Sequence, residues 1–212
     1  MDAAPTASLS GRKAQAARND QTILAAARAV FIADPTAPIS AVAERAGVGI
    51  SALYRRYPSK EDLLRKLCSD GLGRYISAAE AMLADEGDPW EAFVRFLRNL
   101  VDADTNSLTQ RLAGTFTPTE DLYRDAGKAQ ELNEQIFARI RAAGVIRPDF
   151  EVDDLSVVLE QLAGIRFGDE RRANRLRHRY LTLVLDALRH PSPTPLPGSP
   201  PTWEELRERW NA

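Results

Sequence analysis

The chain has 212 residues, of which 44% are hydrophobic and 27% are charged, and its formal net charge is −2. This balance excludes a low-complexity protein, and no apolar run approaches the roughly 20 residues that a membrane-spanning helix needs. The single cysteine, Cys68, excludes an intramolecular disulfide and a cysteine-based zinc site, and two histidines are too few for a histidine-based one. We therefore expect a soluble, cytoplasmic chain with no metal, no cofactor and no membrane partner.

The N-terminal quarter of the chain predicts an arm followed by a helix. Residues 1–18 are polar and basic, which favours a flexible arm. Residues 20–33 carry apolar side chains at helical spacing, and the proline-rich stretch 34–38 ends this helix.

Residues 39–60 contain two short helical patterns joined at a glycine. Val42 and Ala46 share one face of the first pattern, and Leu53 and Tyr57 share one face of the second. Gly47 lies between the two patterns, where a tight turn needs a residue that tolerates a positive φ. The spacing predicts a helix-turn-helix, a device that reads DNA, within a domain at 19–58.

The charge distribution supports this interpretation. Residues 11–66 contain ten lysines and arginines against five acidic residues, whereas the remainder of the chain has a net charge of −7. Basic residues attract the phosphates of DNA, so the split indicates a DNA-binding head and a body that does not bind DNA.

The rest of the chain predicts a helical body. Helices are expected at 59–86, 88–101, 105–114, 119–143, 152–167 and 170–189, and the first of them links head to body and carries Gly71 and Gly73 as a possible bend. A proline-rich linker follows, with a short helix after Thr202. The fold class is all-α, a three-helix head plus a C-terminal bundle, about nine helices in total. Domains are expected at 1–18, 19–58, 59–190 and 191–212.

Two segments carry a family resemblance. Residues 46–63 run Ala-Gly-Val, a short variable stretch, Leu-Tyr, a further aromatic residue and Lys-Glu, and they resemble the signature of the TetR/AcrR family of transcriptional regulators. Residues 23–31 resemble that family's first helix at the expected distance. The resemblance implies a sequence-specific regulator, usually a repressor, that responds to a small-molecule effector.

The candidate DNA contacts follow from the motif. The N-terminal part of the second helix of a helix-turn-helix faces base edges, and Arg55 is the side chain there that can make a bidentate contact with guanine. Arg56, Lys60 and the hydroxyl of Tyr54 suit phosphates, and the basic arm suits an adjacent groove or the backbone. The candidate set is Arg12, Lys13, Arg18, Ser40, Gly49, Ile50, Ser51, Ala52, Tyr54, Arg55, Arg56 and Lys60.

The apolar side chains of the body allow two interpretations. They line either a cavity between helices or an ordinary packed core. The resemblance implies a cavity for an apolar effector, because members of the family commonly bind one between these helices. The candidate ligand-binding residues are Trp90, Phe93, Phe96, Leu97, Leu112, Phe116, Tyr123 and Phe137.

The last two long helices predict assembly. Both 152–167 and 170–189 carry an apolar face, and the resemblance implies that such a pair forms the four-helix interface of a homodimer, which would bind a palindromic operator. The alternative is an all-helical enzyme or an interaction module that has lost DNA binding. For an enzyme, we find no Ser/His/Asp constellation, metal-ligand spacing or glycine-rich phosphate loop, so we expect none.

Overall fold

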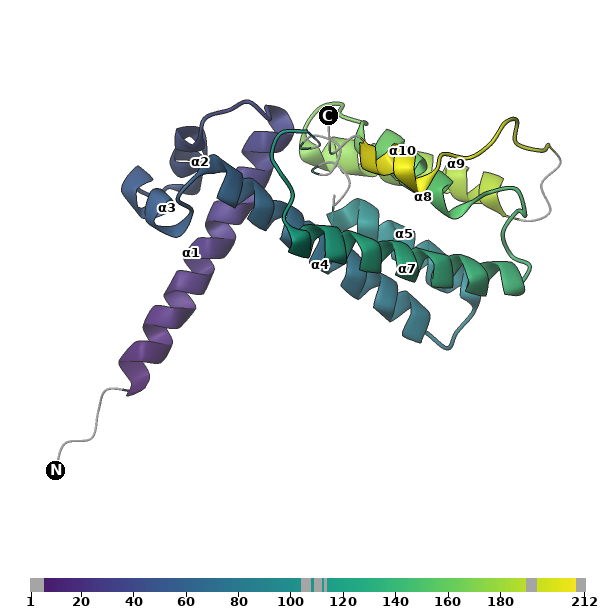
Figure 1. Cartoon of the computed structure of the whole chain (residues 1–212), viewed down its shortest axis with the longest axis horizontal. Helices are drawn as coiled ribbons and strands as arrows, with labels where there is room; N and C mark the ends of the chain where they lie inside the picture. Colours follow the sequence, from purple (N-terminus) through teal and green to yellow (C-terminus); the bar gives the residue numbers. More distant parts are fainter. Residues whose placement is uncertain (1–5, 104–107, 109–111, 113, 190–193, 209–212) are drawn as a thin grey trace. The chain divides into compact units, whose positions relative to one another are not determined.

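The computed structural model describes the backbone of residues 6–103, 108, 112, 114–189 and 194–208, and the side chains of these residues from Arg18 onward. The chain divides into two compact units, Met1–Leu67 and Cys68–Ala212 (Figure 1). Nine helices are described in these ranges, together with one isolated β-bridge between Ile146 and Arg189. The predicted all-α class is confirmed. No described helix is both long and apolar enough to cross a membrane.

Unit 1 contains the helix-turn-helix. Helices α1 (Thr6–Ala33), α2 (Ile39–Ala46) and α3 (Ile50–Arg56) are followed by the first residues of α4 (Lys60–Ala84). The apolar stripes predicted for these helices meet in one small core. Its fully or almost fully buried side chains are those of Ala27, Phe31, Val42, Leu53, Leu63, Leu64 and Leu67.

The turn between α2 and α3 has the backbone that the sequence predicts. Gly47 has a φ of 66°, and its N–H lies within hydrogen-bond reach of the carbonyls of Ala43 and Glu44. The next amide, that of Val48, also donates to Ala43 at 3.0 Å. These bonds satisfy the carbonyls of Ala43 and Glu44 and end α2, so that α3 can begin at Ile50.

Two N-terminal features differ from the sequence-based expectations. The backbone is helical from Thr6, so residues 6–18 extend α1, whereas a flexible arm was expected; the alanines among residues 14–17 favour a helix. The boundary between the units follows Leu67, whereas Pro58 was expected to mark it. The first two turns of α4, in which leucines 63, 64 and 67 are buried, thus belong to unit 1.

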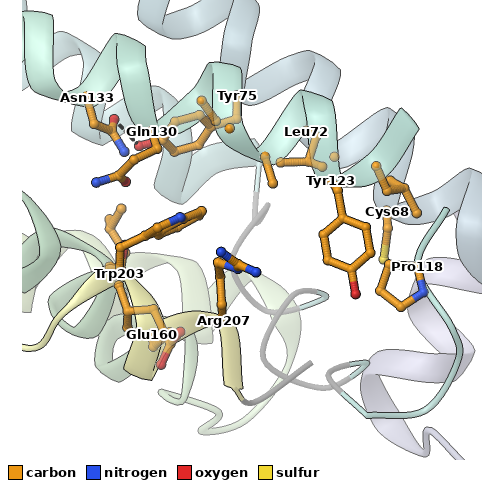
Figure 2. A pocket seen from close by; sticks show the side chains of 18 of the residues that line it. Cys68, Leu72, Tyr75, Pro118, Tyr123, Gln130, Asn133, Glu160, Trp203 and Arg207 are labelled. Atoms are coloured by element: carbon orange, nitrogen blue, oxygen red, sulfur yellow. Dashed lines mark hydrogen bonds between the residues drawn. The ribbon is translucent and has the colours of Figure 1, made fainter. Parts of the chain in front are cut away.

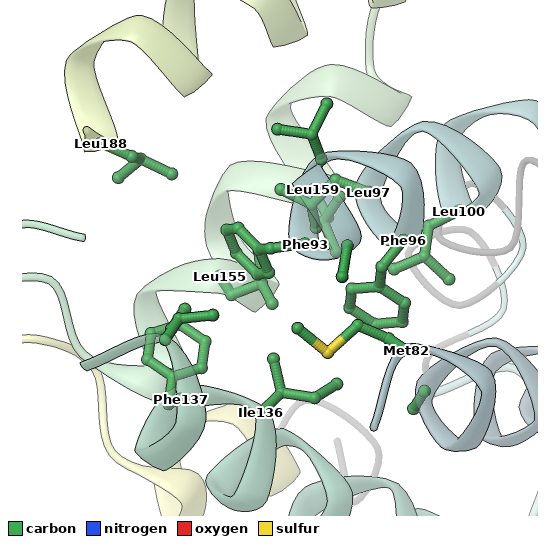
Figure 3. Close-up of a cluster of buried hydrophobic side chains, with 14 of the residues drawn as sticks. Met82, Phe93, Phe96, Leu97, Leu100, Ile136, Phe137, Leu155, Leu159 and Leu188 are labelled. Carbon is green, nitrogen blue, oxygen red and sulfur yellow. The ribbon is translucent and has the colours of Figure 1, made fainter. Parts of the chain in front are cut away.

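Unit 2 is a helical bundle. It contains the rest of α4, then α5 (Pro89–Ala103), α7 (Glu120–Ala142), α8 (Val152–Ala163), α9 (Glu170–Leu188) and the short α10 (Trp203–Glu208). Side chains of α4, α5, α7, α8 and α9 form one continuous core, part of which is shown in Figure 3. Its aromatic centre is Phe93, whose ring lies 6.3 Å from that of Phe137 in an edge-to-face arrangement.

The start of α5 in unit 2 agrees with the sequence-based prediction, whereas the end of α8 does not. Asp88 accepts a hydrogen bond from the amide of Glu91 at 2.9 Å, as the predicted cap requires. Helix α8 ends at Ala163, four residues before the expected end, where the C-cap is Gly164, a poor helix former. The helix expected at 105–114 falls almost entirely outside the described residues.

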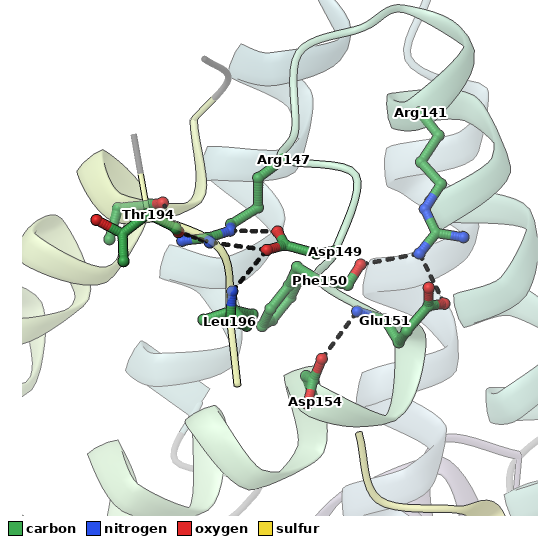
Figure 4. A network of polar contacts seen from close by, with 9 residues as sticks. Arg141, Arg147, Asp149, Phe150, Glu151, Asp154, Thr194 and Leu196 are labelled. Carbon is green, nitrogen blue, oxygen red and sulfur yellow. Dashed lines mark hydrogen bonds and ion pairs between the residues drawn. The ribbon is translucent and has the colours of Figure 1, made fainter. Parts of the chain in front are cut away.

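A polar network holds the start of the C-terminal segment (Figure 4). Arg147 forms a bidentate ion pair with Asp149, with N–O distances of 2.6 and 3.0 Å. Asp149 also accepts the amide of Leu196 at 2.8 Å, and Arg147 donates to the carbonyl of Thr194. The ion pair therefore ties residues 194–196 to the loop between α7 and α8.

Candidate nucleic-acid interface and ligand cavity

Helix α3 presents one face to solvent and the other to the core. Leu53 is fully buried and Tyr57, which follows the helix, is almost fully buried, while Ile50 and Tyr54 are 40% and 47% exposed. Arg55 is exposed as well, as are Ser51 and Ala52. The candidate base-contacting residues thus share an outward-facing surface, which we call the α3 surface and define as residues 50–52, 54 and 55.

Two of the candidate phosphate contacts are held within the protein. The Arg56 guanidinium donates to both carboxylate oxygens of Asp20 in α1, at 2.8 and 3.0 Å. The Lys60 ammonium donates to the carbonyl of Pro35 at 2.8 Å and lies over the ring of Phe31. Both cations therefore have intramolecular partners that the sequence did not predict, and each contributes to the packing of unit 1.

Asp20 joins α1 to the end of α3. Besides Arg56, it accepts the hydroxyl of Tyr57 at 2.6 Å. The hydrogen bond from Arg56 is the main cause that lowers the pKa of Asp20 below its ordinary value of 3.8, and partial burial opposes it. The carboxylate is therefore ionised at neutral pH and fixes the position of α3.

The remaining DNA candidates lie on the same unit. Arg12 and Lys13 are part of α1, but their side chains lie outside those described, and Arg18 is exposed one turn further along. Ser40 is exposed in the first turn of α2, and Gly49 is the N-cap of α3. Helix α2 starts after Pro38, and no side chain caps its first amides.

Unit 2 contains a cavity of about 550 Å³ (Figure 2). Its walls come from α4, α7, α8 and α10 and from the segment that precedes α7. Cys68, Leu72 and Tyr75 line it from α4, and Trp203 and Arg207 line it from α10. The volume is within the range of pockets that hold drug-sized molecules.

The cavity is mostly apolar with a few polar groups. The Tyr75 hydroxyl donates to the side-chain oxygen of Asn133 at 2.6 Å, and burial raises the pKa of Tyr75 above its ordinary value. Burial likewise raises the pKa of the Cys68 thiol to about 12, so this wall residue is a neutral thiol. The amide of Gln130 donates to Asp153 at 3.0 Å. These groups can orient a bound molecule, and neither Tyr75 nor Cys68 titrates near neutral pH.

Only part of the candidate ligand-binding set reaches the cavity. Phe116 and Tyr123 line its wall. Leu112 is buried away from the wall, and the others lie instead in the packed core of unit 2 because they occupy the inward stripes of α5 and α7. The core residues are Trp90, Phe93, Phe96, Leu97 and Phe137.

Several wall residues were not among the candidates. Asn133 is the one that the sequence could have indicated, because it is a buried polar residue on the otherwise apolar stripe of α7. Trp203 and Arg207 follow a proline-rich segment, and no local pattern shows where such a segment ends in space. Among the described residues, no group of three histidine, cysteine or acidic side chains could hold a metal ion.

Comparison with known proteins matches both units. The family model "Bacterial regulatory proteins, tetR family" matches residues 23–67, and "Transcriptional regulator SbtR-like, C-terminal domain" matches residues 88–190. No protein with a curated function matches the chain in sequence.

Solved structures of TetR-type regulators are also similar to this chain. A TetR transcriptional regulator from Streptomyces coelicolor is 30% identical, with a TM-score of 0.54 over 80% of this chain and 97% of that one. A TetR regulatory protein from Mycobacterium vanbaalenii is 28% identical, with a TM-score of 0.54 over 84% and 98%. The TetR-like regulator LfrR from Mycobacterium smegmatis, in complex with proflavine, shares the fold at 23% identity, with a TM-score of 0.57 over 79% and 96%. The chain belongs to the TetR family of bacterial transcriptional regulators.

Proposed function

We propose that this regulator is a homodimeric, non-enzymatic repressor that binds a palindromic operator and leaves it when a small, mainly apolar effector fills the cavity of unit 2. The observation that carries the proposal is the α3 surface. Its side chains are exposed, while Leu53 and the Asp20–Arg56 ion pair hold the helix from behind. A recognition helix held in this way meets bases without first being ordered.

Three residues of the α3 surface have roles that their chemistry allows. Arg55 donates two hydrogen bonds to guanine, Ile50 contacts a thymine methyl group, and the hydroxyl of Tyr54 donates to a phosphate. Ser40 and the uncapped amides of α2 suit a second phosphate. Affinity then depends on several contacts, and base preference mainly on Arg55.

The proposed dimer uses apolar side chains that the protomer leaves exposed or half-buried. Leu155, Leu159 and Leu162 of α8 are buried within unit 2, as are Leu181 and Leu185 of α9, so we assign them to the core of the protomer. Other apolar side chains remain exposed or half-buried there, among them Val158 of α8, Tyr180 and Leu183 of α9, and Ile165, which follows α8. We propose that these four pack against their copies across a two-fold axis.

The effector proposal rests on the cavity. It is enclosed mostly by aromatic and aliphatic side chains and has a polar pair, Tyr75 and Asn133, on one wall. LfrR, which shares the fold, has been solved with the aromatic molecule proflavine, and this favours a ring-containing effector. Binding releases the operator only if the effector prefers one arrangement of the DNA-binding units over another.

The test is a footprint on the promoter of the protein's own gene at several salt concentrations. We expect a palindromic protected region with half-sites about 34 to 36 Å apart and an affinity that falls as salt increases. Light scattering should show a dimer at micromolar concentration. Leu183→Asp should give a monomer, and Thr182→Asp, a neighbouring exposed position on the same helix, should not. A dimer without any salt-dependent DNA binding would instead support an interaction module.

A further inference from the structure

Helix α10 completes the cavity wall. Trp203, Leu206 and Arg207 all line the cavity, although the previous helix ends at Leu188. In Figure 2 the side chains of Trp203 and Arg207 face the wall made by α4 and α7, with Trp203 opposite the Tyr75–Asn133 pair. A segment near the C-terminus therefore supplies one side of a cavity whose other sides are the bundle.

Local contacts hold α10 in this position. Thr202 and Glu205 form a reciprocal cap, in which each amide donates to the other side chain, at 2.7 and 3.2 Å. Leu206 is the one buried side chain of the helix. Upstream, the Arg147–Asp149 ion pair fixes residues 194–196. The segment is thus attached to the rest of unit 2 at residues 194–196 and through the burial of Leu206, and the cap stabilises the helix itself.

The side chains of α10 differ in kind from the other walls. Arg207 is the one cation among the described cavity-lining residues, and Glu160 is the one acid. Figure 2 shows the Arg207 guanidinium pointing toward the space between Trp203 and Tyr123, whereas Glu160 lies on the other side of Trp203 from the Tyr75–Asn133 pair. A flat aromatic face and a positive charge are therefore presented together, beside a mostly apolar space.

We propose that α10 determines effector specificity: Trp203 stacks on a ring of the effector, and Arg207 pairs with an acidic group that the effector carries. The effector class is then an apolar, ring-containing acid of drug-like size. This inference rests on the proposed function, because it assigns the ligand of the same cavity. Stacking uses the face of the indole, and a carboxylate or sulfonate accepts two hydrogen bonds from a guanidinium.

Two fluorescent probes test the proposal in the full chain. Anilinonaphthalene sulfonate and N-phenyl-1-naphthylamine share one ring system, and only the first has an acidic group. The wild-type protein should bind the sulfonate more tightly by about fivefold or more. Arg207→Gln should abolish this preference by weakening the sulfonate alone, and Arg207→Lys should retain part of it. Trp203→Leu should weaken both probes.

A matched control and a second measurement complete the test. Arg171→Gln, at an exposed position of α9 away from the cavity, should change neither affinity. Hydrogen exchange of the amides of 203–208 should slow when the sulfonate binds. Equal affinities of the wild type for the two probes, an unchanged preference in Arg207→Gln, or unchanged exchange in α10 would each overturn the proposal.

Operator binding separates this inference from the proposed function. If the wild type binds its operator while the substitutions of Trp203 and Arg207 leave the affinities of both probes unchanged, the specificity role of α10 is wrong and the repressor function stands. If the substitutions change the probe affinities as expected but the protein binds no operator, the cavity assignment stands and the repressor function is wrong.

Discussion

Arg56 at the end of α3 forms a bidentate ion pair with Asp20 in α1, with N–O distances of 2.8 and 3.0 Å. Because the same carboxylate accepts the Tyr57 hydroxyl, one acidic side chain fixes two consecutive residues of the recognition region. The pair therefore links the stability of unit 1 to the geometry of its DNA-reading surface.

Removing the charge of Asp20 should destabilise unit 1 in a pH-dependent way. The folded protein lowers the pKa of Asp20, so its stabilising effect is fully present above the ordinary value of 3.8 and is lost as pH falls through the lower folded value. We expect Asp20→Asn to cost about 1 kcal/mol at neutral pH, since the pair is partly exposed. Thermal unfolding from pH 7 to pH 3 should show the difference from wild type shrinking below pH 3.8. The exposed Glu44→Gln is the control, and a constant difference would contradict the role of the ion pair.

Arg55→Ala and Lys60→Ala should act differently. Arg55→Ala should reduce operator affinity by about 1 to 3 kcal/mol and relax the preference at one base position. Lys60→Ala removes the bond to Pro35, so we expect about 1 kcal/mol lower stability and an unchanged salt slope of DNA binding. Binding titrations on specific and random DNA, together with thermal unfolding, check both. A flatter salt slope for Lys60→Ala would show that its ammonium contacts phosphate.

Gly73→Ala should stiffen α4 without a clash. A β-carbon at this position meets nothing within 4 Å, and alanine favours a helix interior by about 1 kcal/mol. We expect a higher melting temperature, unchanged operator binding and weaker release by effector. Gly71→Ala should give the same gain in stability but also adds a methyl group to the cavity wall, so it should alter effector affinity as well. Unchanged release in Gly73→Ala would mean that α4 does not bend there.

Phe93→Ala and Tyr123→Ala should separate the core from the cavity. Phe93 is fully buried in the core, and its removal should cost about 3 to 5 kcal/mol of unfolding free energy. Tyr123 lines the cavity and is 45% exposed, so Tyr123→Ala should leave stability nearly unchanged and alter binding of anilinonaphthalene sulfonate. Chemical denaturation and probe titration provide the two measurements. Equal losses of stability would show that Tyr123 is also a core residue.

Periodicity predicted the features that depend on neighbours along the chain. The helical spacing that places Leu53 and Tyr57 on the buried face also places Ile50 and Tyr54 on the exposed face, so one pattern identifies both the core face and the α3 surface. The Gly47 turn was predictable for the same reason, since it depends only on local backbone geometry.

Features that depend on distant partners could not be predicted. Asp20 and Arg56 are 36 residues apart, and nothing in either segment indicates the other. Periodicity also cannot distinguish a wall from a core, because both use inward-facing apolar side chains. Phe93 and Phe116 therefore look alike in sequence, and only Phe116 lies at the cavity.

The division of α4 has a consequence for signalling. Leu67 is buried at the end of unit 1, and the next residue, Cys68, already lines the cavity of unit 2. On the proposed function, α4 is therefore the covalent path from the cavity to the DNA-binding unit, because this one helix contains residues of both units. Substitutions deep in the core of α5 or α9 should accordingly change the stability of the protein without changing the coupling between effector binding and operator binding.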